Sequence, residues 1–150
     1  MSLILAGCGG SAQKKAQTVH GRGFRFGAPA GWHIAEARTS AAATHDSQLV
    51  QVTIFPLIKR YDDALFGKVR RELDARMQAV AAQLHGKVTG SRTVTAGGIR
   101  SHSYDVGVGG DVVEYTFVLD GRREYQLLCR RPSAVSDAPC AQLLSSFAAG

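Results

Sequence analysis

The sequence predicts an α+β fold, and three observations lead to this class. Several stretches between residues 24 and 129 alternate apolar and polar side chains, which is the period of a strand with one buried face. One long stretch, 62–84, instead spaces its apolar residues by three and four, as an amphipathic helix does. A shorter stretch, 138–148, has a second apolar stripe of this kind. With 150 residues, of which 45% are hydrophobic, the chain is long enough for one domain with a buried core.

The first half of the domain is predicted to hold three strands, at 24–26, 32–36 and 49–55. Pro29 and Gly31 indicate a turn between the first two strands. The stretch 38–47 is small and polar, so it is predicted as a loop. Pro56 is expected to end the third strand, because proline cannot donate a hydrogen bond to a neighbouring strand.

Residues 62–84 are predicted to form the one long helix. Asp62 or Asp63 can cap its N-terminus, and Gly86 is expected to end it. A helix that covers a sheet accounts for the apolar stripe without the further assumption of a partner-binding face. The stripe consists of Phe66, Val69, Leu73, Met77, Val80 and Leu84.

The second half is predicted to be mostly strand and to end in a short helix. Gly97-Gly98 predicts a turn, and the glycine-rich stretch 107–110 predicts a loop. Asp120-Gly121 is a strong signal for a hairpin. Arg130-Arg131-Pro132 is expected to leave the sheet. The predicted elements are strands at 88–95, 99–106, 112–119 and 123–129, and a helix at 138–148.

The N-terminus contains the pattern that says most about location. Leu5-Ala6-Gly7-Cys8 resembles the lipobox of bacterial lipoproteins. The resemblance implies cleavage after Gly7 and attachment of diacylglycerol to Cys8, which would anchor the protein to the cell membrane on its extracytoplasmic face. The chain then divides into a residual signal peptide (1–7), a lipidated cysteine with a flexible tether (8–20) and a single domain (21–150).

The segment before Cys8 is shorter than a secretory signal, which has a basic region and an apolar region of about 7–15 residues. Two interpretations therefore stay open. Either the true start lies upstream of Met1, or Met1 is the start of a cytosolic protein that matches the lipobox by chance.

The chain has three cysteines, an odd number, which in a secreted protein suggests that one thiol has a separate role. Lipidation of Cys8 would leave Cys129 and Cys140 as a pair, and disulfides persist in oxidising compartments. The alternative is two buried thiols in a reduced, cytosolic protein. No CxxC pattern or zinc-ligand spacing occurs, so we predict neither a metal nor another cofactor.

The formal net charge is +6, from 18 Lys and Arg against 12 Asp and Glu. These basic residues are spread along the chain and few are interleaved with aromatics, so the pattern disfavours nucleic acid as a partner. Attraction to an anionic surface is the simpler explanation. Lys14 and Lys15, near the expected anchor, would lie close to acidic lipid headgroups.

The order of elements resembles the PsbP-like fold, a superfamily that includes an extrinsic photosystem protein, a Ran-binding import factor and many small bacterial lipoproteins. The resemblance implies an antiparallel sheet sandwiched by helices on its two faces (an α/β/α sandwich), with one long and one short C-terminal helix. It implies no functional residue, since a fold does not fix function. The motifs that resemble the family are Phe24-x-Phe26-x-x-Pro29-x-Gly31-Trp32, the glycines before Ile99, Tyr125-x-Leu127 and Leu143-Leu144-Ser145-Ser146-Phe147.

Residues with catalytic potential form no local motif. The five histidines lack the spacing of a metal site, and no Gly-x-Ser-x-Gly elbow occurs. Asp105, Asp111 and Glu114 could line a site, although solvated loop and strand positions are the default explanation. Convergence of His33 or His102 with a carboxylate in a pocket would favour an enzyme, whereas an apolar groove without titratable groups would favour binding.

We therefore expect a lipid-anchored, non-catalytic binding or protein-interaction module of the bacterial cell envelope. Its partner would be another envelope protein or a small ligand in the cleft between sheet and helix. The alternative is a secreted or anchored enzyme, a hydrolase with its site in the same cleft. The sequence predicts no oligomeric state.

Overall fold

The computed structural model describes residues 16–150. Its elements form two antiparallel sheets and two α-helices. In chain order they are β1 (Gln17–Gly21), β2 (Phe24–Ala28), β3 (His33–Glu36), β4 (Ser40–His45), β5 (Gln48–Tyr61), the 3-10 helix η1 (Asp63–Leu65), α1 (Phe66–Gln83), β6 (Lys87–Ala96), β7 (Ile99–Val108), β8 (Asp111–Pro132), α2 (Ala138–Ser146) and β9 (Ala148–Ala149).

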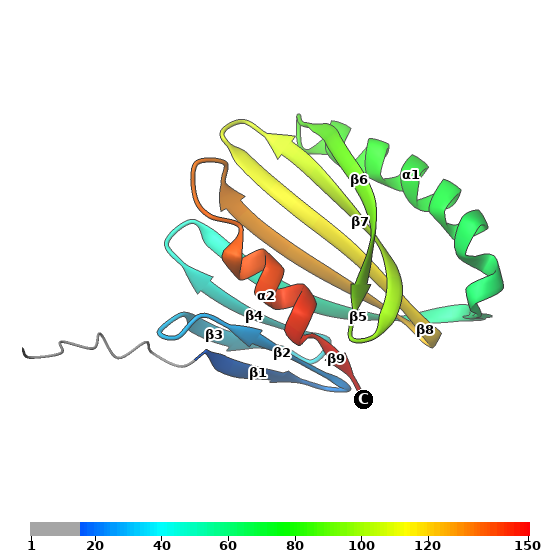
Figure 1. Cartoon of the computed structure of the whole chain (residues 1–150), viewed down its shortest axis with the longest axis horizontal. Helices are drawn as coiled ribbons and strands as arrows, with labels where there is room; N and C mark the ends of the chain where they lie inside the picture. Colours follow the sequence, from blue (N-terminus) through cyan, green and yellow to red (C-terminus); the bar gives the residue numbers. More distant parts are fainter. Residues whose placement is uncertain (1–15) are drawn as a thin grey trace, which may run out of the picture.

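The larger sheet has the order β3-β4-β5-β8-β7-β6, and the smaller one has the order β1-β2-β9. Helix α1 covers one face of the larger sheet, whereas α2 and the smaller sheet lie on the other (Figure 1). Successive residues of a strand point to opposite faces. Accordingly, Phe117 packs in the cluster under α1, and Val118 packs in the cluster with α2. The expected helix–sheet–helix layering is confirmed in outline, with a small sheet added beside α2.

β8 folds back on itself at Gly121, so its two arms lie side by side in the larger sheet (Figure 1). Gly121 has φ = +60°, a conformation that glycine adopts without strain. At the open end of this hairpin, the N–H of Ser133 donates to the carbonyl oxygen of Gly110 over 2.8 Å. The first arm pairs with β7 and the second with β5. The predicted hairpin at Asp120-Gly121 is therefore confirmed.

Three predictions for the first half were wrong. The stretch 38–47 is not a loop, because it contains β4. Its buried side chains are alanines, which give a weak strand signal in sequence but leave room for the smaller sheet to pack closely. In addition, the folded domain begins before Gly21, since β1 starts at Gln17 and Val19 is 1% exposed.

Pro56 does not end β5, which continues to Tyr61. The N–H of Ile54 donates to the carbonyl oxygen of Thr39, the residue just before β4 starts, over 2.9 Å. Backbone groups two residues apart on a strand point to the same side. The nitrogen of Pro56 therefore faces the side of β5 beyond the extent of β4, and its missing N–H leaves no strand unpaired.

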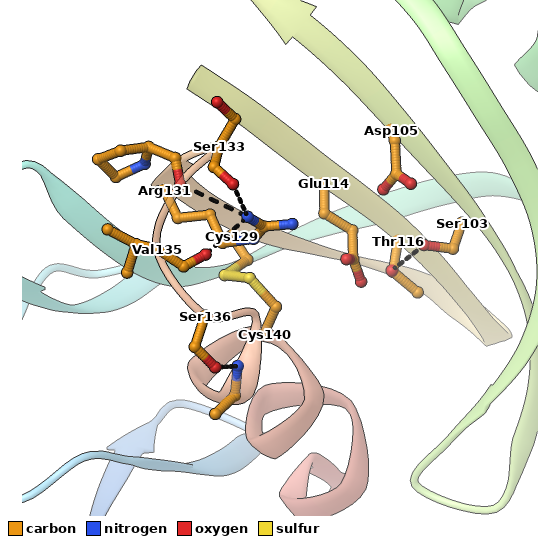
Figure 2. The surroundings of a disulfide bond; sticks show 12 residues. Ser103, Asp105, Glu114, Thr116, Cys129, Arg131, Ser133, Val135, Ser136 and Cys140 are labelled. Atoms are coloured by element: carbon orange, nitrogen blue, oxygen red, sulfur yellow. Dashed lines mark hydrogen bonds between the residues drawn. A yellow bond between two sulfur atoms is a disulfide. The ribbon is translucent and has the colours of Figure 1, made fainter. Parts of the chain in front are cut away.

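A disulfide joins the second arm of β8 to α2, as the cysteine count predicted. The sulfur atoms of Cys129 and Cys140 are 2.01 Å apart, and both residues are buried (Figure 2). Arg131 stabilises the connection to α2. Its Nη1 donates to the carbonyl oxygens of Pro132, Ser133 and Val135, and the shortest of these bonds is 2.9 Å, to Val135. Ser136 Oγ accepts from the N–H of Ala138 at the start of α2.

Candidate functional site

A groove with a volume of about 340 Å³ lies between the end of β5, the start of α1 and the turn of β8. Its apolar lining comes from all three elements and from η1. Its rim contains lysine and arginine side chains. The lining residues are Leu57, Lys59, Arg60, Tyr61, Leu65, Lys68, Val69, Glu72 and Leu119.

The groove exists in part because β5 bulges outward. Pro56 pairs with Arg123 and Tyr61 pairs with Gly121, so residues 57–60 of β5 face a much shorter length of β8. Extra residues on one strand of an antiparallel pair bend that strand away from its partner. The Nη1 of Arg122 donates to the carbonyl oxygen of Ile58 over 3.2 Å, which holds the bulge against the β8 turn.

The start of α1 covers this end of the sheet only in part, because Phe66 stacks on His102 of β7 but the two residues after it are exposed. The buried residues of α1 are Leu73, Met77 and Ala81, all beyond its first turn. Val69 is only partly buried, and Leu65 in η1 is 37% exposed. The apolar stripe predicted from the sequence is therefore buried most fully at Leu73 and Met77, whereas Val69 in an earlier turn lines the groove.

Three exposed apolar residues belong to the chain segments that line the groove or directly precede it. Ile58 is 96% exposed, and Phe55 and Leu65 are 39% and 37% exposed. These are three of the five exposed large hydrophobic residues in the described part of the chain. Single exposed hydrophobics are ordinary on protein surfaces, but a group of them indicates an interaction site.

Cations outnumber acids among the residues that line the groove, and two further acids, Asp62 and Asp63, follow Tyr61 directly. Lys59, Arg60 and Lys68 line the groove against one carboxylate, Glu72. Arg122 is also exposed, on the β8 turn beside Ile58. This arrangement attracts an anionic group and holds it next to an apolar surface.

Tyr61 supplies a hydrogen-bonding group to the groove. Burial raises the pKa of its phenol above the ordinary value, and the nearby Asp63 carboxylate raises it further. The phenol is therefore protonated at neutral pH and can donate to an acceptor on a bound molecule.

The structure does not bring the two candidate histidines together. His33 is exposed on β3, at one edge of the larger sheet. His102 lies on β7 and is 4% exposed, with its ring stacked on Phe66 at 3.9 Å between centroids. Neither histidine is among the residues that line the groove.

The candidate carboxylates lie in ion pairs outside the groove. Asp105 and Glu114 share Arg92, at 3.2 and 3.1 Å, and Asp111 pairs with Arg130 at 2.7 Å. Burial raises the pKa of the Glu114 carboxyl, and Arg92 opposes this rise. Figure 2 shows Asp105 and Glu114 on the sheet face near the disulfide. Each of these acids pairs with an exposed arginine, Arg92 or Arg130, which is a structural role.

At the start of the long helix, both predicted capping acids have partners. Asp62 Oδ1 accepts from the N–H of Ala64 over 2.9 Å, so this acid caps η1, the short turn that leads into α1. The N-cap position of α1 itself is Leu65, which has no side-chain cap, so the capping prediction holds only for the turn before the helix. Asp63 pairs instead with Arg100, at 2.9 Å.

Cys8, Lys14 and Lys15 lie outside the described residues. Within residues 16–150, neither helix has the length and hydropathy needed to cross a bilayer.

Sequence reasoning placed a ligand in the cleft between sheet and helix but named no residue there. The groove lies between the sheet and α1, and most of its lining residues come from the end of β5 (Leu57, Lys59, Arg60 and Tyr61) and from the start of α1. The one available signal was an apolar pair followed directly by two basic residues. Its meaning depends on the bulge in β5, which the sequence pattern does not reveal.

Comparisons with known proteins show similarity in structure. No protein-family profile and no curated protein sequence matches the chain. The solution structure of cyanobacterial PsbP (CyanoP) from Synechocystis sp. PCC 6803 matches with a TM-score of 0.67 at 15% identity, covering 97% of this chain and 99% of that one. A crystal structure from Bacteroides thetaiotaomicron VPI-5482 matches with a TM-score of 0.52 at 13% identity, covering 92% of this chain and 49% of that one. The chain therefore has the PsbP-like fold that its motifs resemble.

Proposed function

We propose that this protein is a non-catalytic binding module of the bacterial cell envelope, anchored through Cys8 outside the cytoplasmic membrane. Its site is the groove between β5 and α1. The observation that carries the proposal is the combination of an apolar groove, the exposed Ile58 and a basic rim in one place.

The proposed location has two supports. The first is the lipobox-like Leu5-Ala6-Gly7-Cys8, which implies a diacylglycerol anchor. Two acyl chains hold a protein stably at a membrane, whereas one does so only marginally. The second support is the disulfide between Cys129 and Cys140, since such bonds persist outside the reducing cytosol.

The side chains in the groove favour binding over catalysis. Its titratable groups are three cations, one carboxylate and Tyr61, whose pKa is raised. A hydrolase of the triad type needs a nucleophile next to a base that a third group orients. The residues that line the groove include neither a histidine nor a serine or cysteine.

One experiment tests both anchor and site. A photo-crosslinking amino acid is placed at Ile58 in the chain expressed with a complete signal peptide, and cell fractions are separated after illumination. We expect the protein in the membrane fraction with a discrete adduct, and we expect the Cys8→Ala form in the soluble fraction. The control places the crosslinker at Lys87, an exposed residue just beyond the C-terminal end of α1.

Two results would contradict the proposal. Equal membrane partition of the Cys8→Ala form, together with an N-terminal peptide of unlipidated mass in the wild type, would remove the anchor. The same adducts at positions 58 and 87, or none at 58, would remove the groove as the binding site.

A further inference from the structure

We infer that the groove accepts an extended segment of another protein in which acidic residues accompany apolar ones. This inference rests on the proposed binding function and names the chemistry of its partner. Three features carry it: the charge of the rim, the shape of the surface and the position of the groove on the molecule.

The charge of the rim favours an acidic partner. Lys59, Arg60 and Lys68 outnumber the single acid Glu72 in the lining, and Arg122 adds a further cation beside Ile58. The lysines and arginines here belong to the exposed surface. Complementary charge across an interface accelerates association and rejects partners of the wrong sign.

The shape of the surface, a groove next to the exposed Ile58, favours a segment of a protein chain over a small ligand or a bilayer. A small molecule that filled the groove would leave Ile58, which is 96% exposed, in water. A flat membrane surface could cover the protruding Ile58 but would leave the adjacent hollow unfilled. A segment with successive apolar side chains can fill the hollow and also cover Ile58.

The position of the groove agrees with a partner that lies away from the anchor. β1 begins at one end of the long axis of the molecule, whereas the junction of β5 and α1 lies at the other end (Figure 1). A tether that enters at β1 therefore leaves the groove directed away from the point of attachment. The site is open to a second protein of the envelope.

Selection from a random library of displayed 12-residue peptides tests this chemistry. The full chain is immobilised, and the bound peptides are sequenced, synthesised and measured by fluorescence anisotropy at 50 and 500 mM NaCl. We expect enriched peptides to combine Asp or Glu with Leu, Ile or Phe, and to bind at least about tenfold more weakly at the higher salt concentration.

Matched variants assign the binding to the groove. Ile58→Asp and the double change Lys59→Glu/Arg60→Glu should each weaken binding at least about tenfold, whereas Lys87→Glu should leave it unchanged. All these residues are exposed, so melting temperatures should agree with the wild type. Vesicles of phosphatidylcholine with one quarter phosphatidylglycerol form the membrane arm, and we expect Ile58→Asp not to alter their binding.

The possible results test the acidic partner separately from the proposed role of the groove as a binding site. Enriched peptides that are basic or uncharged, yet sensitive to Ile58→Asp, would overturn the acidic partner and keep the groove as a binding site. Vesicle binding lost in Ile58→Asp, without enrichment of acidic peptides, would assign the surface to a membrane. Peptides whose binding none of the groove variants weakens would overturn the inference. The crosslinks at position 58 would then decide separately whether the protein is a binding module.

Discussion

At the scale of single residues, His102 is a titratable group whose surroundings oppose its charge. It is 4% exposed, and its Nε2 has no hydrogen-bond partner in the described structure. Burial lowers the pKa of the imidazole, and the positive charges of Arg70 and Arg100 act in the same direction. The backbone of Phe66 and the carboxylate of Asp74 oppose the shift without cancelling it. The folded protein therefore holds this histidine neutral.

A lowered pKa makes stability depend on pH in a defined direction. Because the unfolded chain binds a proton on His102 more readily than the folded one, stability is highest above the ordinary histidine pKa of about 6.5 and falls as the pH falls below it. We expect the free energy of unfolding in urea to decrease between pH 7.5 and pH 5.0. In His102→Phe, which retains a ring beside Phe66, this decrease should be smaller.

The comparison of the two proteins isolates the contribution of His102, since the other histidines are common to both. An equal decrease in the wild type and in His102→Phe would show that burial of this ring is not linked to protonation. The stacked arrangement would then have only a packing role.

Residues whose roles depend on near neighbours in the sequence could be predicted, and residues whose roles depend on distant partners could not. The cap at Asp62 involves Ala64, two residues away, and was predicted. The exposure of Ile58 depends on the register between β5 and the β8 turn, which lies more than sixty residues later. For this reason the sequence predicts a cleft between sheet and helix but not the residues that line the groove.

At the scale of elements, α1 is held by the later turns of its apolar face. Leu73 is 3% exposed and packs under the helix with Met77 and residues of β7 and β8. Removal of a buried leucine side chain leaves a cavity, so we expect Leu73→Ala to reduce the free energy of unfolding by about 2–5 kcal/mol. Arg71→Ala, on the exposed face of the same helix, should change it by less than about 0.5 kcal/mol.

Urea denaturation monitored by circular dichroism measures both changes. If Leu73→Ala had the stability of the wild type but lost binding to the selected peptides, the stripe would be an interface along its whole length. In that case Leu73 would face a binding partner, contrary to its burial against the sheet in the structure.

The strands that local sequence determines could be predicted, whereas those that depend on tertiary packing could not. The hairpin of β8 was predictable because Gly121 adopts its turn conformation locally, with φ = +60°. β4 was not predictable, because the alanines at 41 and 43 become a buried strand only through packing with the smaller sheet. The continuation of β5 through Pro56 depends on how far β4 extends, which is again a tertiary feature.

At the scale of the whole molecule, the disulfide connects layers that distant parts of the chain build. Cys129 belongs to the larger sheet, and Cys140 belongs to α2, which packs between that sheet and β2. The smaller sheet includes β9, which follows α2 directly, so the position of α2 also fixes the C-terminal strand beside β2. A bond between positions 129 and 140 therefore restrains the second layer of the fold as a unit.

This restraint leads to the last prediction, which concerns the oxidised and reduced proteins. The bond closes a loop with a sequence separation of 11, and loop-closure entropy assigns about 3 kcal/mol to such a link. For a domain of this size, that difference corresponds to a melting temperature roughly 10 °C higher in the oxidised form. The measurement is thermal unfolding of the full chain with and without dithiothreitol. Cys129→Ala/Cys140→Ala is the control, because reductant should leave its melting temperature unchanged. A wild type whose melting temperature does not respond to dithiothreitol, although peptide mapping shows the bond to be reduced, would mean that packing of α2 alone holds the second layer in place.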